Sequence, residues 1–230
     1  MMRRVGLILQ ARFGSQRLPG KALADLRGKT LLGRCLSRLL LGGAGPVILA
    51  TTTRAEDAML AGVAHRLGVD VHRGDTEDVL GRYVEAALAH GLDVVVRATG
   101  DNPAVDIDAA ARLARALECS QADYMCEDGL PLGAGVEIVT TRALVRAAAL
   151  SDAAEDREHV TTFLKRRPDL FRIERRLAPP SLRRPELRFT VDTATDLTRM
   201  RRLFADVQGD EPPVGALIAA ADACRDHEAA

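Results

Sequence analysis

The sequence has no tryptophan, few other aromatic residues and no excess charge of either sign. Aromatic residues make up 3% of its 230 positions, and 32 Lys and Arg residues balance 32 Asp and Glu residues. Proteins that bind nucleic acid without regard to sequence need a positively charged surface, and those that bind single strands also stack bases on aromatic side chains. We therefore expect no nucleic-acid partner.

Cysteines and long apolar runs are also scarce. The four cysteines form neither C-x-x-C nor a zinc-finger pattern, and we interpret them as reduced, mostly buried thiols. The apolar run after Arg4 is too short for the core of a signal peptide, and no segment reaches membrane-spanning length. These observations exclude a disulfide scaffold and predict a cytoplasmic protein that does not enter a membrane.

What the chain does contain is a regular alternation of short apolar runs and amphipathic segments. Strands are predicted at Val5–Gln10, Pro46–Thr51, Val69–His72 and Asp93–Arg97, each followed by a segment with helical spacing. This order predicts an α/β fold with a mostly parallel central sheet and helices on both faces. The length and the 47% hydrophobic content fit one domain, which we expect to cover residues 1–230.

Polar residues mark where the predicted helices begin. Thr30 and Thr76 are the expected N-caps of helices at 30–40 and 76–90. The other helices predicted in the first half cover 55–67 and 106–117. In the less regular second half, strands are predicted at 135–140, 171–176 and 187–191, and helices at 141–149, 155–166, 195–207 and 213–224.

A loop rich in glycine and arginine follows the first predicted strand. Its sequence is Q-A-R-F-G-S-Q-R-L-P-G-K, from Gln10 to Lys21. Ligands of open α/β sheets bind at the carboxyl ends of the strands, and glycines let the backbone approach them closely. Arg12, Arg17 and Lys21 place three cations in this loop, which suits a triphosphate. A solvated basic loop is the alternative, and the position after the strand favours the ligand.

Two aspartates follow or end predicted strands far apart in the sequence. Asp101 lies in R-A-T-G-D-N-P, and Asp192 lies in R-F-T-V-D-T-A-T-D. Mg²⁺ prefers one or two carboxylates together with phosphate oxygens and water, so the pair is a candidate metal site. A turn aspartate that bonds its own backbone is the alternative for Asp101. Asp196 is expected in the first turn of the next helix, where a carboxylate complements the helix dipole.

Two further charged segments carry weaker signals. Residues Arg73–Asp78 join a strand to a helix and are either nucleotide contacts or a capped helix start. Residues Asp156–His159 put several charge-capable groups in one turn and are either part of a site or a solvated helix face.

Seven segments spread along nearly the whole chain carry one resemblance: Q-A-R-F-G-S-Q-R-L-P-G-K at 10–21, A-T-T-T at 50–53, R-G-D-T-E-D-V-L-G-R-Y at 73–83, R-A-T-G-D-N-P at 97–103, G-V-E at 135–137, D-R-E-H-V-T at 156–161 and R-F-T-V-D-T-A-T-D-L at 188–197. In this order they resemble one family, the SpsF-type cytidylyltransferases. This family is named for a spore-coat polysaccharide biosynthesis protein and is related to the KDO and acylneuraminate cytidylyltransferases. The chain departs from it at Asn102, where a cysteine is expected.

The resemblance implies a Rossmann-like nucleotide-diphospho-sugar transferase fold and a homodimer. It implies transfer of CMP from CTP to a small acceptor, with Mg²⁺ and with release of pyrophosphate. Residues 1–118 would form the nucleotide-binding half, and residues 119–230 the half that binds the acceptor and completes the metal site.

The resemblance also implies roles for individual residues. The expected catalytic residues are Arg12, Arg17 and Lys21 at the triphosphate and Asp101 and Asp192 at the metal. The nucleotide site would further include Gln10, Ala11, Gly14, Ser15, Thr51, Thr52, Arg73, Gly74, Arg97 and Thr99. The acceptor would contact Glu137, Arg157, Glu158 and His159.

The sequence leaves the acceptor and some rival functions open. The acceptor is a sugar acid, a sugar, or a phosphorylated or phosphonate metabolite. A nucleotidyltransferase that uses UTP or GTP with a sugar phosphate is the nearest alternative. A glycosyltransferase with a nucleotide-sugar donor shares the fold but makes no pyrophosphate, and a catalytically silent nucleotide-binding protein is the remaining alternative.

Overall fold

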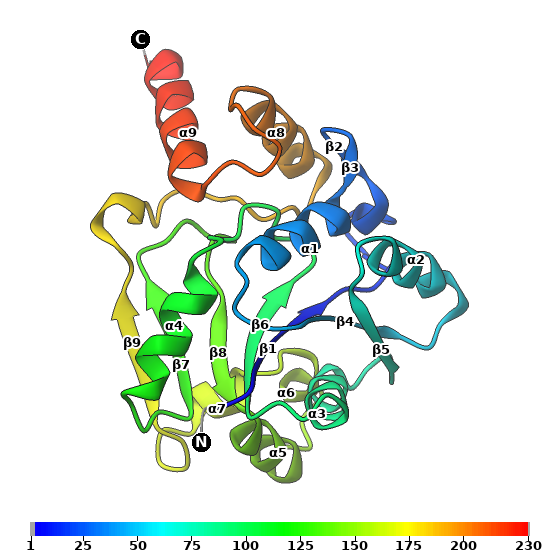
Figure 1. Ribbon diagram of the computed structural model, residues 1–230. Coiled ribbons are helices and arrows are strands. Elements are labelled where there is room, and N and C mark those ends of the chain that lie inside the picture. Colours follow the sequence, from blue (N-terminus) through cyan, green and yellow to red (C-terminus); the bar gives the residue numbers. More distant parts are fainter. Residues whose placement is uncertain (1–2, 230) are drawn as a thin grey trace.

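The computed structural model describes residues 3–229. Within them, strands from both halves of the chain form a seven-stranded sheet in the order β5-β4-β1-β6-β8-β7-β9 (Figure 1). The parallel strands include β1 (Val5–Gln10), β4 (Val47–Thr52), β5 (Asp70–Gly74) and β6 (Val94–Thr99). The sheet confirms the predicted α/β class, with the antiparallel pairs of β8 (Glu137–Thr140) as its exception.

The sheet is buried on both faces, which explains why its strands are continuous apolar runs. Leu7 and Leu9 of β1 pack into one core cluster, and Ile8 between them packs into the other. All three side chains are buried. Because successive side chains of a strand point to opposite faces, a strand covered by helices on both sides needs apolar residues at every position.

Helices cover the two faces in separate groups. Residues of α1 (Leu31–Leu41), α2 (Ala58–Arg66) and α4 (Ala109–Glu118) share the first core cluster. Residues of α3 (Val79–Ala89) and α5 (Thr141–Leu150) share the second. The predicted helices on both faces are therefore confirmed.

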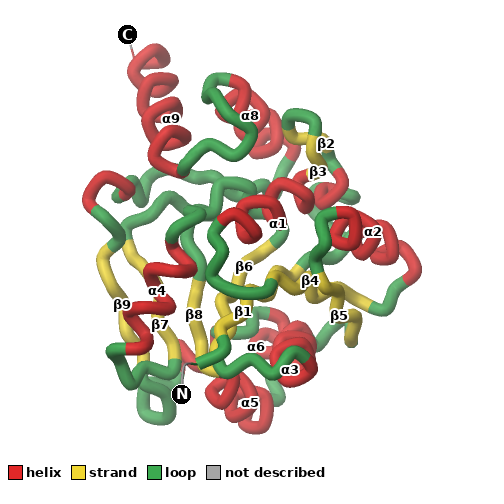
Figure 2. Tube along the Cα trace, viewed as in Figure 1, coloured by secondary structure: helices red, strands yellow, loops and turns green. Residues whose placement is uncertain are grey.

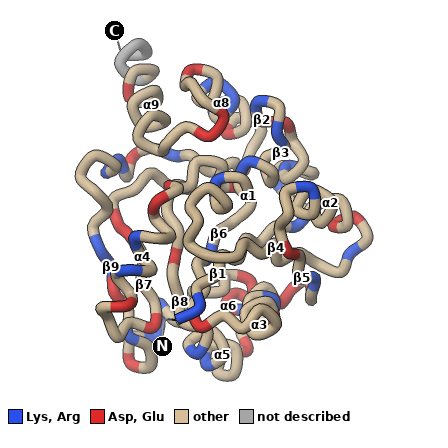
Figure 3. The backbone as a smooth tube through the Cα atoms, in the orientation of Figure 1, with Lys and Arg blue, Asp and Glu red and all other residues tan. Residues whose placement is uncertain are grey.

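The chain closes with two helices beyond the sheet. They are α8 (Ala194–Ala205) and α9 (Val214–Ala229). Loops and turns fill the region between the sheet and these two helices (Figure 2). Cations and acids are interspersed along the whole trace, in keeping with the zero net charge (Figure 3).

Helix starts agree with the sequence at Thr30 but not at Thr76. The Thr30 hydroxyl accepts a hydrogen bond from Gly33 N, as an N-cap does. In contrast, α3 begins after Asp78, whose carboxylate accepts from Gly81 N at 2.7 Å. Asp75 accepts hydrogen bonds from the amides of Glu77 and Asp78, so an aspartate turn replaces the predicted first turn.

The helix predicted at 155–166 is two short helices. They are α6 (Ala154–Glu158) and α7 (Thr162–Arg166). Val160 between them has a φ of 52°, a left-handed conformation that no helix of L-residues continues through. The chain therefore turns a corner at Val160.

Some strands were missed or wrongly predicted. The sequence analysis did not predict β7 (Tyr124–Asp128), which pairs with β8 and β9 (Ile173–Leu177). It also did not predict the two-residue strands β2 (Asp25–Leu26) and β3 (Lys29–Thr30). The strand predicted at 187–191 forms only one bridge, between Leu132 and Arg188.

Two expectations about composition have mixed outcomes. All four cysteines are free thiols, but only Cys35 and Cys126 are buried, whereas Cys119 and Cys224 are exposed. In the part of the chain that the structure describes, no helix combines the length and apolar character needed to cross a membrane.

Candidate active site

A cavity of about 580 Å³ opens where β1 and β6 end. These neighbouring strands are in register at Gln10 and Thr99, so the loops that follow them leave the sheet side by side. The cavity brings together thirteen of the residues predicted for the site. They are Gln10, Ala11, Arg12, Gly14, Ser15, Arg17, Lys21, Arg97, Thr99, Asp101, Glu158, His159 and Asp192.

A buried aspartate anchors the loop that follows β1. Asp57 Oδ1 accepts a hydrogen bond from Phe13 N at 2.6 Å, and its other carboxylate oxygen accepts from the hydroxyl of Thr52. Asp57 is 1% exposed. A charged acceptor that binds a backbone amide inside the protein fixes that backbone strongly. Asp57, which the sequence did not single out, therefore holds the loop against β4.

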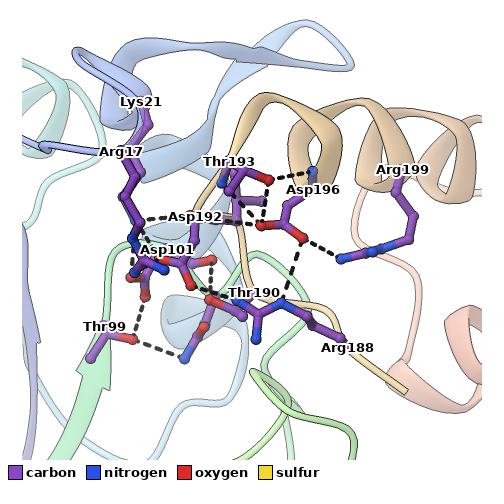
Figure 4. A network of polar contacts seen from close by, with 12 residues as sticks. Arg17, Lys21, Thr99, Asp101, Arg188, Thr190, Asp192, Thr193, Asp196 and Arg199 are labelled. Carbon is purple, nitrogen blue, oxygen red and sulfur yellow. Dashed lines mark hydrogen bonds and ion pairs between the residues drawn. The ribbon is translucent and has the colours of Figure 1, made fainter. Parts of the chain in front are cut away.

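The two predicted metal aspartates meet at one cation (Figure 4). Lys21 Nζ lies 3.1 Å from Asp101 Oδ2 and 3.2 Å from Asp192 Oδ1, and it donates to Val191 O at 2.8 Å. Arg17 Nη2 lies 2.8 Å from Asp192 Oδ1. Residues from three distant segments thus form one ionic cluster on the wall of the cavity.

Neighbouring polar groups fix the orientation of both carboxylates. Asp101 Oδ1 accepts from the hydroxyl of Thr99 at 2.7 Å, and that hydroxyl accepts from Asn102 Nδ2 at 2.8 Å. Asp192 Oδ2 accepts from Arg188 Nη2 at 2.6 Å. The oxygens that face Lys21 are therefore presented in defined positions.

Asp196 lies in the first turn of α8, as expected. It forms a reciprocal capping box with Thr193, and its carboxylate also accepts from the amide of Asp192 at 3.1 Å. Burial alone would raise the pKa of Asp196, but the hydrogen bonds from Thr193, from the Asp192 amide and from Arg199 lower it to about 2. Asp196 thus holds the chain beside Asp192.

The donor set fits a single Mg²⁺ ion. The observation that supports this is the convergence of two carboxylates on the Lys21 ammonium group, which stands where a cation is held. Among residues 3–229 there is no cluster of three or more His, Cys, Asp or Glu side chains suited to a metal. Two carboxylates, with the remaining positions left to phosphate oxygens and water, are the set that Mg²⁺ prefers.

Arg82 of α3 is a cation in the cavity that the prediction did not name. It is 2% exposed, and its Nη1 donates to Asp75 O at 3.0 Å, while its Nε has no hydrogen-bond partner in the described structure. Burial is the main cause that lowers its pKa, and nearby Arg12 lowers it further. A signal existed, since Arg82 lies in the motif at 73–83 that carries the resemblance. The other lining residues that were missed are Gln16, Ala22, Val79 and Gly100.

Several predicted contacts lie outside this cavity. Arg73 donates to the backbone carbonyls of Thr52 and Arg54 at 2.9 and 2.8 Å, so its guanidinium joins β5 to the loop after β4. The neighbouring residues Thr51 and Gly74 are buried and do not line the cavity either.

Arg157 also lies outside the cavity, because its contacts are structural. It donates to Ser151 O at 2.9 Å and to Ala148 O at 2.7 Å, and its Nη1 lies 3.0 Å from Asp78 Oδ2. It therefore ties α6 to the end of α5 and to the start of α3. Glu158 and His159 beside it do line the cavity.

Two other hollows lie elsewhere on the described surface. One, of about 330 Å³, contains Glu137 and shares Arg97 and Thr99 with the first cavity. The other, of about 770 Å³, is lined by Arg142 and Phe171 among others and contains none of the predicted site residues.

An α/β sheet with a cationic loop after its first strand and two carboxylates converging on the same cavity is the arrangement that a nucleotidyltransferase needs. A family model described as cytidylyltransferase matches residues 7–217. The chain therefore belongs to the cytidylyltransferase family and is an enzyme.

Similar proteins agree with this assignment. The chain is 34% identical over 217 residues to the spore coat polysaccharide biosynthesis protein SpsF of Bacillus subtilis. The aligned region covers 91% of this chain and 89% of that protein. It is 35% identical over 202 residues to an uncharacterized protein of Methanocaldococcus jannaschii, with 87% and 82% covered. A 3-deoxy-manno-octulosonate cytidylyltransferase of Anaeromyxobacter is 40% identical over 121 residues, about half of each chain.

Solved structures give the same fold. A cytidylyltransferase from Leptospira borgpetersenii superposes with a TM-score of 0.88 at 26% identity, over 97% of this chain and 96% of that one. A CMP:2-keto-3-deoxy-manno-octonic acid synthetase solved with CTP superposes with a TM-score of 0.64 at 17% identity, over 88% and 98%, which supports the fold alone.

Proposed function

We propose that this enzyme transfers CMP from CTP to a small acceptor, with Mg²⁺ and with release of pyrophosphate. The observation that carries the proposal is the cluster in which Lys21 and Arg17 meet Asp101 and Asp192 at the cavity wall. Family membership supports CTP as the donor. The acceptor class proposed is a sugar acid, a sugar, or a phosphorylated or phosphonate metabolite.

The proposed reaction is a substitution at the α-phosphorus of CTP. An acceptor oxygen forms a new bond to this phosphorus, and the bond from the phosphorus to the bridging oxygen breaks. Pyrophosphate leaves with the bonding electron pair. Where the attacking oxygen is a hydroxyl, its proton passes to solvent, and where it is an ionised phosphate or phosphonate oxygen, no proton is released. A bound Mg²⁺ would neutralise phosphate charge. The chain's own contribution is to hold the triphosphate with Arg12, Arg17 and Lys21 and to orient the reactants, so positioning and electrostatic stabilisation carry the catalysis.

The two halves of the chain divide this task in the proposal. Residues 1–118 supply the triphosphate loop and Asp101, and residues 119–230 supply Asp192 and most of the lining of the hollow around Glu137. A homodimer and a cytoplasmic location, both expected from the sequence, belong to the same proposal. Light scattering measures the oligomeric state and so tests the homodimer.

Calorimetry with the four nucleoside triphosphates tests the nucleotide half of the proposal directly. Binding of CTP, UTP, GTP and ATP is measured with and without Mg²⁺, which needs no knowledge of the acceptor. We expect a preference for CTP that depends on the metal. Preference for UTP or GTP would favour the alternative of a nucleotidyltransferase that acts on a sugar phosphate. Equal or absent binding of all four nucleotides would overturn the proposal.

A further inference from the structure

The hollow around Glu137 lies directly beside the proposed nucleotide cavity. It measures about 330 Å³ and is bounded by β7, by β8 and by Lys165 of α7 and Arg175 of β9. Arg97 and Thr99 line both cavities, so the two spaces adjoin at these residues.

Glu137 is saturated by contacts with its neighbours. Its Oε2 accepts from Arg97 Nη1 at 2.7 Å and from the Thr161 hydroxyl at 2.9 Å. Its Oε1 accepts from the Tyr124 hydroxyl at 2.6 Å and from Lys165 Nζ at 3.0 Å. A carboxylate has about four lone-pair sites, and all of them are used here.

The same contacts keep Glu137 ionised. Burial alone would raise its pKa, but the charges of Arg97 and Lys165 and the hydrogen bonds it accepts lower the pKa to about 2. Glu137 is therefore a poor proton acceptor near neutral pH and a poor direct ligand for an acceptor molecule. Its geometry is that of a group that holds other side chains in place.

Two cations of this hollow have hydrogen-bond donors beyond those they give to acidic side chains. The Lys165 ammonium group has three N–H donors and gives one to Glu137. Arg175 donates from Nε and Nη2 to Asp128, so its Nη1 is available to a ligand. The acids are engaged, since Asp128 is paired with Arg175 and Glu127 accepts from an arginine of α4 on both oxygens.

We propose that Glu137 is a positioning residue that holds Lys165 so that its free donors face an anionic group, carboxylate or phosphate, of the acceptor bound in this hollow. The inference rests on the proposed function, because it takes the adjoining cavity as the nucleotide site. Lys165 is then the residue that contacts the acceptor, and Glu137 acts through it.

Glu137 also connects the two cavities. Arg97 Nη1 binds Glu137, and Arg97 Nη2 donates to Gln10 Oε1 at 3.2 Å on the nucleotide side. These contacts run from Lys165 through Glu137 and Arg97 to Gln10, and so they connect the second hollow to the nucleotide cavity. Loss of the charge on Glu137 is thus expected to weaken the positioning of both Lys165 and Arg97.

The scarcity of lysine makes this inference accessible to NMR. Lys21, Lys29 and Lys165 are the only lysines of the chain. Protein labelled with ¹³C at the lysine Cε gives one signal from each, assigned by single substitutions. Lys21 reports on Mg·CTP, Lys165 reports on the second hollow, and Lys29, paired with Asp210 and Glu211, is the internal control.

The titration is done with the triphosphate loop already filled by saturating Mg·CTP. Acetate, glucuronate and inorganic phosphate are the anionic probes at tens of millimolar, and glucose is the neutral match for glucuronate. We expect the Lys165 signal to move with at least one anion and not with glucose, while Lys29 stays fixed. Carboxylate and phosphate probes distinguish the two kinds of acceptor.

Variants separate positioning from direct binding. In Glu137→Gln the movement of the Lys165 signal with anions should fall several-fold, and in Tyr124→Phe, which removes one donor and keeps the charge pair, it should fall less. Arg142→Gln, in the remote hollow, should leave it unchanged. An unchanged Lys29 signal verifies the fold of each variant.

Each failure has its own signature. No response of Lys165 to any anion in the wild-type protein would overturn the anion site, and an equal response in Glu137→Gln would overturn the positioning role. No response of Lys21 to Mg·CTP would instead count against the proposed function.

Discussion

The carboxylates of Asp101 and Asp192 share one ammonium group, since Lys21 Nζ lies 3.1 Å from the first and 3.2 Å from the second. Two carboxylates drawn to one ammonium group repel each other, and the positive charge between them offsets that repulsion. Lys21 supplies that charge. The site is thus organised around a positive charge that belongs to the chain itself.

Removing either carboxylate should abolish most of the turnover. We expect Asp101→Asn and Asp192→Asn each to lower kcat by about a hundredfold or more, the usual cost of losing one preorganised electrostatic contact at a reacting phosphate. Pyrophosphate release at a series of Mg²⁺ concentrations measures this. Asp152→Asn, at an exposed position outside the cavity, is the matched control. Full turnover in both variants would contradict the metal assignment.

Arg82 and Arg73 should respond differently to the same change. Arg82→Gln removes a buried cation with an unpartnered Nε from the cavity, so CTP affinity should fall by about 1.5–3 kcal/mol, or roughly ten- to a hundredfold. Arg73→Gln removes two bonds to backbone carbonyls outside the cavity and should lower stability with little change in affinity. Calorimetry with CTP and urea unfolding of both variants test the contrast, and equal losses of affinity would contradict it.

Asp57 should matter for the triphosphate loop although it touches no ligand. Asp57→Ala leaves the Phe13 amide and the Thr52 hydroxyl without their buried acceptor, which should lower the free energy of unfolding by about 1–3 kcal/mol. The freed loop should also bind CTP more weakly. Urea unfolding and CTP titration measure the two effects. A variant with wild-type values in both would show that the loop is fixed by other contacts.

Acid should destabilise the protein in part through Glu137. Its pKa is about 2 when folded, against an ordinary value of 4.5, so the unfolded chain binds a proton at a higher pH than the folded one. The stability that this group contributes is full above the ordinary pKa and is lost as the pH falls towards 2. Over this range the free energy of unfolding should fall less steeply in Glu137→Gln than in the wild type. Urea unfolding at a series of pH values tests this, and identical slopes would contradict it.

The sequence predicted the first half of the fold well because its signals are local there. The parallel strands are continuous apolar runs, and Thr30 caps its helix with its own side chain. The strand β7 was missed since its residues, Y-M-C-E-D, neither alternate nor form a long apolar run. The predicted strand at 187–191 is extended chain whose amides pair elsewhere, for example Val191 N with Asp101 O.

The candidate site was predictable where residue type alone decides the role. Cations and glycines after a first strand, and aspartates after buried strands, indicate phosphate and metal chemistry, and the cavity contains them. Arginine is harder to interpret, because the same guanidinium serves a ligand or a backbone carbonyl. Only tertiary contacts separate Arg82, which faces the cavity, from Arg157, whose donors are spent on Ser151, Ala148 and Asp78.

The left-handed residue between α6 and α7 has a consequence for how substrate range changes within such a chain. Glu158 and Lys165 are seven residues apart, and one unbroken helix would place them on the same face. The corner at Val160 instead lets Glu158 line the nucleotide cavity while Lys165 lines the second hollow. Arg157 ties α6 to α5 and to the start of α3, and Arg166 of α7 donates to Asp156 of α6 at 2.6 Å, so the corner is held on both sides. A substitution at Val160 would therefore displace Glu158 and Lys165 together, and both the nucleotide side and the acceptor side would change.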